Sequence, residues 1–461
     1  MEDSTSPWWK DRWLWGALLV GALCRVVPLL IWPMLECVRD ECIYRSIAYK
    51  IIGGGGLTTA SKGWLPAPGF PYLLAVFKVA TGSFQAVKWV HVVLSWISIG
   101  LMYLIGERVG GTRRVARIAA WLFAVNPTIA WFTNTLWIET IYIFCLLAAS
   151  LVVLRARELS WWWALPGGMA LGMAILFRGM ATYLPPFFLL GLMYPAAWTP
   201  AAVVEGAKGG WRHAVAFLLG IVLMVAPYSF YASEKHGGFL VTDATSGHVL
   251  YLGNNDYPPL TFDYGNGMLT QPLFQRYLRI GRKPCPRKQS PVQAMACEAD
   301  AAKQWILDNP GEFTSRIPQR LAQFVNPHSF LTRHIRWGYF RGMPWQLKEF
   351  MVAYTAVFSA MVMLGGTLGA WARARGPFGA IALGTIAYTF ATISVVYGMT
   401  RFRLPLEPLW MIYLAILLSD WRGTSRLLGE SVPRQIGALL TLPALFALML
   451  WYLPSGWPLF W

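Results

Sequence analysis

Long apolar segments alternate with short polar connections along most of this chain. About eleven of the segments approach the roughly 20 residues that a helix needs to cross a bilayer. They cover residues 13–35, 84–106, 115–132, 135–154, 161–177, 180–198, 213–231, 350–371, 377–397, 404–420 and 436–453. The pattern predicts a polytopic, mainly α-helical membrane protein.

Arginine and lysine are concentrated in every second connection. Cytoplasmic loops carry an excess of these residues, so the alternation predicts a cytoplasmic N-terminus. The basic residues that carry this inference are Lys10, Arg12, Arg108, Arg113, Arg114, Arg117, Arg155, Arg157, Lys208, Arg212, Arg373, Arg375, Arg422, Arg426 and Arg434. Loop 36–83 and the long segment 232–349 are then both on the outer face. We expect an N-terminal membrane module over 1–231, an extracytoplasmic domain over 232–349 and C-terminal membrane helices over 350–461.

The segment 232–349 has the composition of a soluble domain. Phe239–Thr242 and His248–Tyr251 have the residue types of short strands. The pattern predicts helices over 295–309 and 313–324, the second interrupted near Pro318. We therefore expect a small mixed α/β domain.

Loop 36–83 begins with two adjacent carboxylates, Asp40 and Glu41, directly after the first apolar segment. Ile43, Ile47 and Ile51 recur every four residues and so share one helix face. The spacing predicts a short amphipathic helix in the membrane interface. Four glycines over 53–56 and three prolines over 66–71 then break regular structure.

The composition agrees with a membrane protein, since 56% of residues are hydrophobic and 13% are charged. A soluble domain has about 25% charged residues. The net charge of +17 indicates contact with anionic lipid head groups and phosphates. Nucleic acid is not an expected partner, because the basic residues are spread over many loops. The first apolar segment is too long for a cleaved signal peptide. We expect the protein to lie in a bacterial inner membrane.

Six cysteines are too few for a disulfide framework. Cys24 and Cys145 lie in apolar segments, where buried thiols are typical. Cys285 and Cys297 fall in the outer segment and could form a bridge. Cys37 and Cys42 also lie outside, and a bridge between them is a second option.

The sequence lacks the common motifs for metal and nucleotide sites, with no HExxH, CxxC pair, DxD, Walker loop or GxSxG. The polar residues that need explanation lie in or beside apolar segments near the outer face. Glu139 could hydrogen-bond another helix or line a cavity with Asp40. Arg178, Arg401 and Arg403 could reach lipid head groups or bind phosphate oxygens. Asp40 could be a helix N-cap, with Glu41 favoured at the positive end of the helix dipole.

The order of these motifs resembles a known family. Asp40-Glu41 precedes Tyr44 and an interfacial helix, and Pro66-Ala67-Pro68-Gly69-Phe70-Pro71 follows. After these come a helix with Glu139, an arginine that ends a segment, Leu252-Gly253-Asn254-Asn255, and Arg401-Phe402-Arg403-Leu404-Pro405. This pattern is similar to the GT-C membrane glycosyltransferases related to dolichyl-phosphate-mannose–protein mannosyltransferases and bacterial aminoarabinose transferases, from about Trp13 to Ser419.

The resemblance implies roles for individual residues. Asp40 would be the catalytic carboxylate, with Glu41 as its neighbour in the motif and Tyr44 in the substrate site. Arg401 or Arg403 would hold the phosphate of a polyprenyl-phosphate sugar, and Glu139 and Arg178 would line the cavity. The acceptor is a lipid, glycan or protein. No soluble cofactor is required, although Asp40 and Glu41 could recruit a divalent metal.

Chemistry gives the same roles independently. A sugar on a lipid phosphate already has a charged leaving group, so the enzyme has to deprotonate an acceptor hydroxyl and stabilise the departing phosphate. A carboxylate suits the first task and fixed arginines the second, and one displacement inverts the anomeric carbon. The alternative is a transporter or flippase of a lipid-linked anionic glycan, which typically has two related halves. A purely structural membrane subunit is the third reading.

Overall fold

The computed structural model describes residues 7–34, 37, 40–57, 65–156, 158–195, 199–256, 285–286, 289–336 and 338–451. Every regular element in these ranges is a helix. The first half of the chain forms η1 Trp8–Lys10, α1 Arg12–Ile31, α2 Asp40–Ile52, α3 Gly69–Thr81, α4 Ala86–Gly110, α5 Arg113–Val125, α6 Pro127–Phe132, α7 Glu139–Ala156, η2 Trp161–Trp163, α8 Ala164–Phe177, η3 Gly179–Tyr183, α9 Pro185–Leu192 and α10 Pro200–His236.

The second half continues the same architecture. It forms α11 Ser246–Gly253, α13 Pro291–Asp308, α14 Pro310–Val325, α15 Phe330–Arg336, α16 Trp345–Arg373, α17 Gly376–Val395, α18 Thr400–Arg403, η4 Leu404–Leu406, α19 Glu407–Ser419, α20 Trp421–Gly429 and α21 Val432–Leu450. The predicted mainly α-helical architecture is confirmed.

Eight of the described helices are long and apolar enough to cross a membrane. They are α1, α4, α7, α10, α16, α17, the unit α18–α19 and α21. The other three predicted spans form shorter elements. Segment 115–132 is divided into α5 and α6 at Asn126-Pro127, segment 161–177 is a short apolar helix, and segment 180–198 contains the eight-residue α9. The structure therefore does not confirm the count of eleven.

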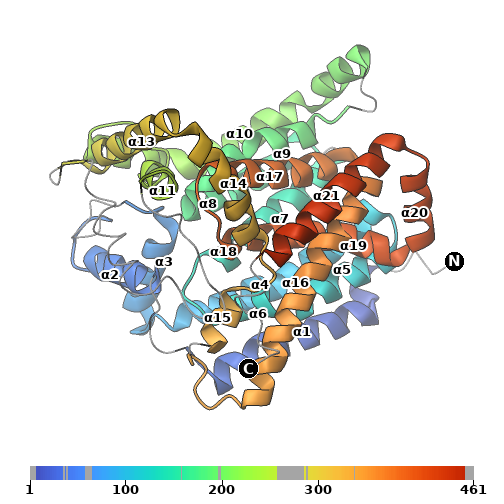
Figure 1. The fold of residues 1–461 in the computed structure, drawn as a ribbon, viewed down its shortest axis with the longest axis horizontal. Coiled ribbons are helices and arrows are strands. Elements are labelled where there is room, and N and C mark those ends of the chain that lie inside the picture. Colours follow the sequence, from blue (N-terminus) through green and yellow to red (C-terminus); the bar gives the residue numbers. More distant parts are fainter. Residues whose placement is uncertain are drawn as a thin grey trace.

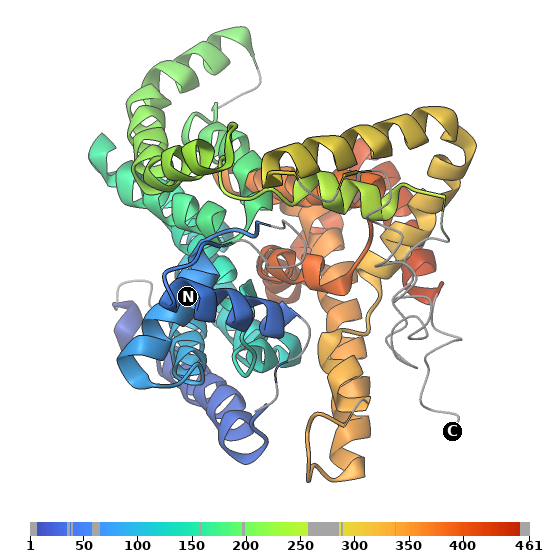
Figure 2. The same cartoon turned by 90° about the vertical axis from the view of Figure 1, so that its left-hand side faces the viewer.

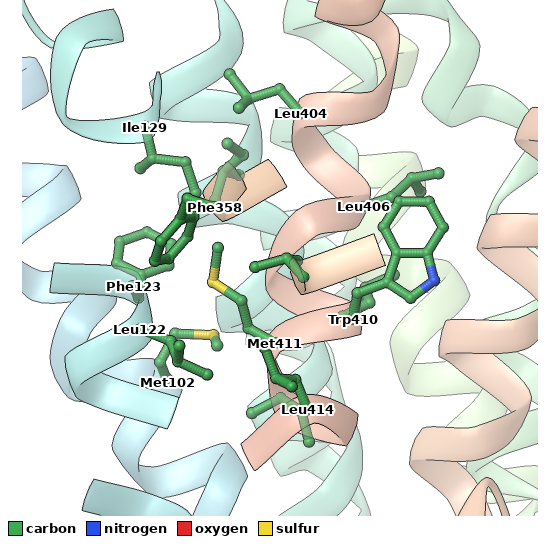
Figure 3. Packing of buried hydrophobic residues seen from close by; sticks show 14 of the residues in the cluster. Met102, Leu122, Phe123, Ile129, Phe358, Leu404, Leu406, Trp410, Met411 and Leu414 are labelled. Carbon is green, nitrogen blue, oxygen red and sulfur yellow. The ribbon is translucent and has the colours of Figure 1, made fainter. Parts of the chain in front are cut away.

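Helix α19 occupies the centre of the bundle, and the span Thr400–Ser419 is the most buried of the eight. Figure 3 shows Met411 and Leu414 of α19 packed among Met102, Leu122 and Phe358, which come from α4, α5 and α16. Within a bilayer, such packing stabilises the fold chiefly through van der Waals contacts between closely fitting helices. The packing fixes the N-terminal end of α19, where α18 presents two arginines.

The amphipathic helix predicted from Ile43, Ile47 and Ile51 is confirmed as α2. Ile47 is fully buried in a hydrophobic cluster that includes Leu240, and Ile43 and Ile51 pack against that cluster. Figure 1 shows α2, α3, α11 and α13 gathered at one end of the bundle, with the N-terminus and α20 at the opposite end. Figure 2 faces the first end and shows α11 and α13 side by side, in agreement with their contacts. We call this the α2 end.

The prediction for segment 232–349 was partly wrong. Residues 248–251 belong to helix α11, and residues 239–242 form no strand. The predicted helix over 295–309 is confirmed as α13, and its neighbour α14 continues through Pro318 without the expected interruption. All regular elements in the described parts of this segment are helices, and residues 257–284 are not among the described residues. The proposed division into three domains stays a prediction.

Both candidate cysteine pairs are disulfides in the structure. Cys37 is bonded to Cys42, with a Cα–Cα distance of 5.1 Å, and Cys285 to Cys297, with 6.0 Å. The first bridge joins the chain before α2 to the first turn of that helix. Cys24 and Cys145 are unbridged, as predicted from their apolar surroundings.

Candidate active site

Arg401 and Asp40 form the centre of the site at the α2 end. Asp40 is the first residue of α2 and Arg401 lies on α18. The Arg401 Nη1 donates to Asp40 Oδ2 over 2.5 Å, and the two side chains are 15% and 31% exposed. A bond across 361 positions of sequence therefore joins the two ends of the predicted motif. Its partial exposure leaves the pair accessible from outside the protein.

Glu139 lies behind this pair and holds two guanidinium groups. Its Oε1 is 3.4 Å from the Nε of Arg401 and 3.5 Å from the Nη1 of Arg178. Within the described part of the chain, neither carboxylate oxygen of Glu139 accepts a hydrogen bond, and the residue is 1% exposed. Burial of an uncompensated charge costs several kcal/mol, so the two arginines account for its placement. The apolar segment predicted over 135–154 becomes helical at Glu139, the first residue of α7.

Aromatic rings surround the two arginines. The Arg401 Cζ is 4.8 Å from the ring centroid of Trp137 and 5.7 Å from that of Phe402. The Arg178 Cζ lies 5.1 Å from Phe402 and 5.5 Å from Tyr142. Rings at these distances stabilise a cation and restrict its orientation. Sequence reasoning did not identify Trp137 or Phe402, although each stands within two residues of a predicted charge.

Tyr44 lies one turn after Asp40, near the charged cluster. Its ring meets Phe70 edge-on at 5.3 Å. Burial raises the pKa of the Tyr44 phenol above its ordinary value, and the negative charge of Asp40 acts in the same direction. A tyrosine is protonated at neutral pH even at its ordinary pKa of about 10, so the Tyr44 hydroxyl can donate a hydrogen bond.

Glu41 binds the backbone ahead of α7. Its Oε1 accepts from the backbone N–H of Leu136 over 2.7 Å, and the residue is 2% exposed. This bond links the first turn of α2 to the turn that precedes Glu139. Glu41 therefore has a structural connection that Asp40, its neighbour in the chain, does not share.

Lys88 joins the same two parts of the chain from the transmembrane helix α4. Its Nζ donates to the carbonyl of Met34 over 2.5 Å and is 3.5 Å from Asn134 Oδ1. The lysine is 1% exposed. A single lysine within an apolar segment was the available sequence signal, and it was missed.

Arg403, the second late arginine, is enclosed at the start of α19. Its Nε is 3.2 Å from Glu407 Oε1, its Nη2 donates to Ser359 Oγ over 3.3 Å, and its Nη1 donates to the Asn326 carbonyl. The other oxygen of Glu407 accepts from Asn126 Nδ2 over 2.7 Å. Arg403 thus joins three parts of the chain. The four-residue spacing to Glu407 was a sequence signal for this pair.

Residues 66–231 match the model of the dolichyl-phosphate-mannose-protein mannosyltransferase family. This match supports a GT-C superfamily glycosyltransferase. The resemblance predicted from the sequence is thereby confirmed over the matched segment. The matched segment includes Glu139 and Arg178, whereas Asp40 and Arg401 lie on either side of it.

Two solved structures are similar over most of the chain. The first is the archaeal oligosaccharyltransferase AglB from Archaeoglobus fulgidus in complex with an inhibitory peptide and a dolichol-phosphate. It is 16% identical with a TM-score of 0.48, over 97% of this chain and 56% of that one. The second is the Archaeoglobus fulgidus oligosaccharyltransferase tethered with an acceptor peptide containing the NVT sequon. It is 14% identical with a TM-score of 0.44, over 97% and 55%. This chain spans just over half the length of these proteins. No curated protein matches the sequence.

Proposed function

We propose that this chain transfers a sugar from a polyprenyl-phosphate donor to an acceptor hydroxyl at the α2 end of the bundle. The observation that carries the proposal is the contact between Arg401 and Asp40, with Glu139 and Arg178 behind it. The family description of the matched segment supports a dolichyl-phosphate type of donor. The alternating basic connections favour an active site on the extracytoplasmic face.

Asp40 is the proposed general base. The acceptor oxygen attacks the anomeric carbon while its proton passes to the Asp40 carboxylate. The bond between that carbon and the phosphate oxygen breaks, and polyprenyl phosphate leaves with the bonding electrons. A single displacement of this kind inverts the anomeric centre. Asp40 is suited to the task because its side chain is partly exposed.

Arg401 is the proposed phosphate ligand. In the structure its guanidinium binds Asp40, so donor binding would exchange this carboxylate for a phosphate oxygen. The exchange frees Asp40 to accept a proton and places a cation where negative charge develops. Glu139 stays behind both arginines and balances part of their charge throughout. Tyr44 would donate its hydroxyl proton in a hydrogen bond to the donor.

Glu41, predicted as a catalytic neighbour, has a better supported role in positioning α2 through Leu136. Arg403 is likewise a poor candidate for donor binding, since its guanidinium is enclosed with Glu407. The two carboxylates predicted as possible metal ligands have other partners in the structure: Asp40 pairs with Arg401, and Glu41 accepts from the backbone N–H of Leu136. We therefore derive no step through a metal.

Proteoliposomes with a labelled polyprenyl-phosphate sugar test the proposal. Wild-type protein should form glycosylated product, and Asp40→Asn should lower the rate by about 10²–10⁴-fold, the usual contribution of a general base. Asp300→Asn is the matched control, because Asp300 is an exposed residue of α13 that pairs with the exposed Lys303. Movement of donor without product would favour the flippase instead, and an active Asp40→Asn protein would exclude Asp40 as the base.

A further inference from the structure

Three segments meet directly before Arg401 in the chain. They are the end of α17 at Val395, the end of α11 at Gly253 and the middle of α14. Helix α14 contacts both α17 and α18, and Figure 1 shows it across the ends of these helices. The short connection 396–399 that carries the chain into α18 is therefore enclosed by residues of the α11–α14 region.

Arg320 of α14 bonds two of these segments with one guanidinium. Its Nη1 donates to the carbonyls of Ser394 and Val395 over 2.7 and 3.0 Å. Its Nη2 donates to the carbonyl of Gly253 over 2.8 Å and to Asn254 Oδ1 over 3.0 Å. The residue is 4% exposed. These bonds satisfy backbone carbonyls at two helix C-termini, which otherwise lack partners within the helix.

Asn254 completes the junction. Its Nδ2 donates to the Val395 carbonyl over 2.8 Å, so α11 and α17 are bonded directly as well as through Arg320. The planar guanidinium can serve two acceptors on each side at once, whereas a lysine ammonium is a single flexible point charge. Arginine is therefore specifically suited to this position.

Two glycines bring the backbones too close for any side chain. A Cβ atom at Gly398 would lie 1.8 Å from the carbonyl oxygen of Arg320, and one at Gly253 would lie 2.1 Å from that of Val396. Both distances are far below van der Waals contact. The connection before Arg401 is thus held both by hydrogen bonds from Arg320 and by close backbone packing.

We propose that Arg320 is a positioning residue that sets the place of Arg401 beside Asp40. This inference depends on the proposed function, in which Arg401 binds the donor phosphate. It assigns a task to α14, a helix that lies outside the matched family segment. Loss of the Arg320 fork would let residues 394–399 shift, and Arg401 would lose its alignment with the phosphate. Binding of the acceptor would change less.

A double-mutant cycle tests the inference on the full-length protein in proteoliposomes. Arg320→Lys should raise the KM for the donor about tenfold, a coupling typical of residues in one network. In an Arg401→Lys background the same change should add less than about threefold, because the aligned arginine is already gone. A merely structural role predicts the same additional loss in both backgrounds, and that result would overturn the inference.

Ser315→Ala is the control on the same helix, because Ser315 is exposed and its hydroxyl donates to the Glu312 carbonyl within α14. It should leave the donor KM within about twofold of wild type. Gly398→Ala is a second test, since it displaces the same connection without altering any charge. It should reproduce the rise in donor KM. Wild-type protein without transfer activity would refute the proposed function, whereas active wild type with an unaffected Arg320→Lys variant would refute only the role of Arg320.

Discussion

Arg401 and Arg403 are two residues apart on one short helix and have opposite surroundings. Arg401 is partly exposed and binds Asp40, a residue from the far end of the sequence. Arg403 is 1% exposed and binds Glu407, four residues away. Side chains two positions apart on a helix point about 200° from each other. One arginine therefore faces the site while the other fastens α18 to the interior.

The comparison separates two uses of the same chemical group. A guanidinium that can exchange its partner is suited to bind a phosphate. A guanidinium enclosed with a carboxylate and backbone carbonyls is suited to hold helices together, because its removal would leave a buried charge without compensation. The predictions below separate these uses by their effects on stability and on activity.

The largest expected effect is on folding, from Arg403→Met. This variant leaves Glu407 buried with one guanidinium removed, which typically costs about 3–5 kcal/mol. Thermal unfolding in detergent should show a large loss of stability. The double variant Arg403→Met/Glu407→Leu should recover most of it, because replacement of both partners by apolar groups is often neutral. A double variant as unstable as the single one would contradict the pair as the cause.

The second effect is on catalysis, from Arg401→Ala. Removal of a donor that stabilises developing charge typically lowers kcat by about 10²–10³-fold, or about 2.7–4 kcal/mol. Glu139 keeps Arg178 as a partner at 3.5 Å, so unfolding should change far less than in Arg403→Met. Parallel assays of transfer and thermal unfolding give the measurement. Equal loss of stability in the two variants would remove the distinction between these arginines.

The smallest expected effect concerns Asp243, which lies between α10 and α11. Its carboxylate has surroundings unlike those of the Arg401–Asp40 and Arg403–Glu407 pairs. It accepts from Thr245 Oγ1 over 3.2 Å, and burial raises its pKa to about 6. A raised pKa means that the folded protein binds this proton more tightly than the unfolded chain does. The resulting stability is present below the ordinary pKa of about 4 and is lost as pH rises through about 6.

Thermal unfolding between pH 4 and 7 tests this contribution. Wild type should lose stability relative to Asp243→Asn across that range, because the asparagine side chain does not ionise. Asp300→Asn, at an exposed position, should follow the wild-type curve. A constant offset between wild type and Asp243→Asn would show that the carboxylate does not titrate differently in the folded state.

Local patterns predicted α2 and the eight long helices because each was encoded within a few turns of sequence. The isoleucines at 43, 47 and 51 mark one helix face, and that face is the one that packs. The same reasoning failed at residues 248–251. Their strand-like composition is overridden by packing of α11 on α13, where Gly247 allows so close an approach that a Cβ would lie 1.9 Å from the carbonyl oxygen of Met295.

Pro318 shows a second limit of predictions made from local sequence. A proline inside a helix costs about 3 kcal/mol, which favoured an interruption in the sequence reading. Helix α14 continues, with Arg316 and Arg320 buried on its packed face. Most helical stability in proteins comes from tertiary packing and not from propensity, so the contacts outweigh the local cost.

The sequence alone determined that this protein is helical, that it contains membrane-length apolar segments, and that a few charged residues stand near their ends. Hydrophobic periodicity and charge placement are local properties, because they depend on residues that are close together in the sequence. Only the tertiary structure decided that Arg401 contacts Asp40, that Glu139 holds two arginines, and that Lys88 joins the turns before α2 and α7. These contacts depend on how distant helices pack. Arg401 and Arg403, two positions apart, consequently have different partners.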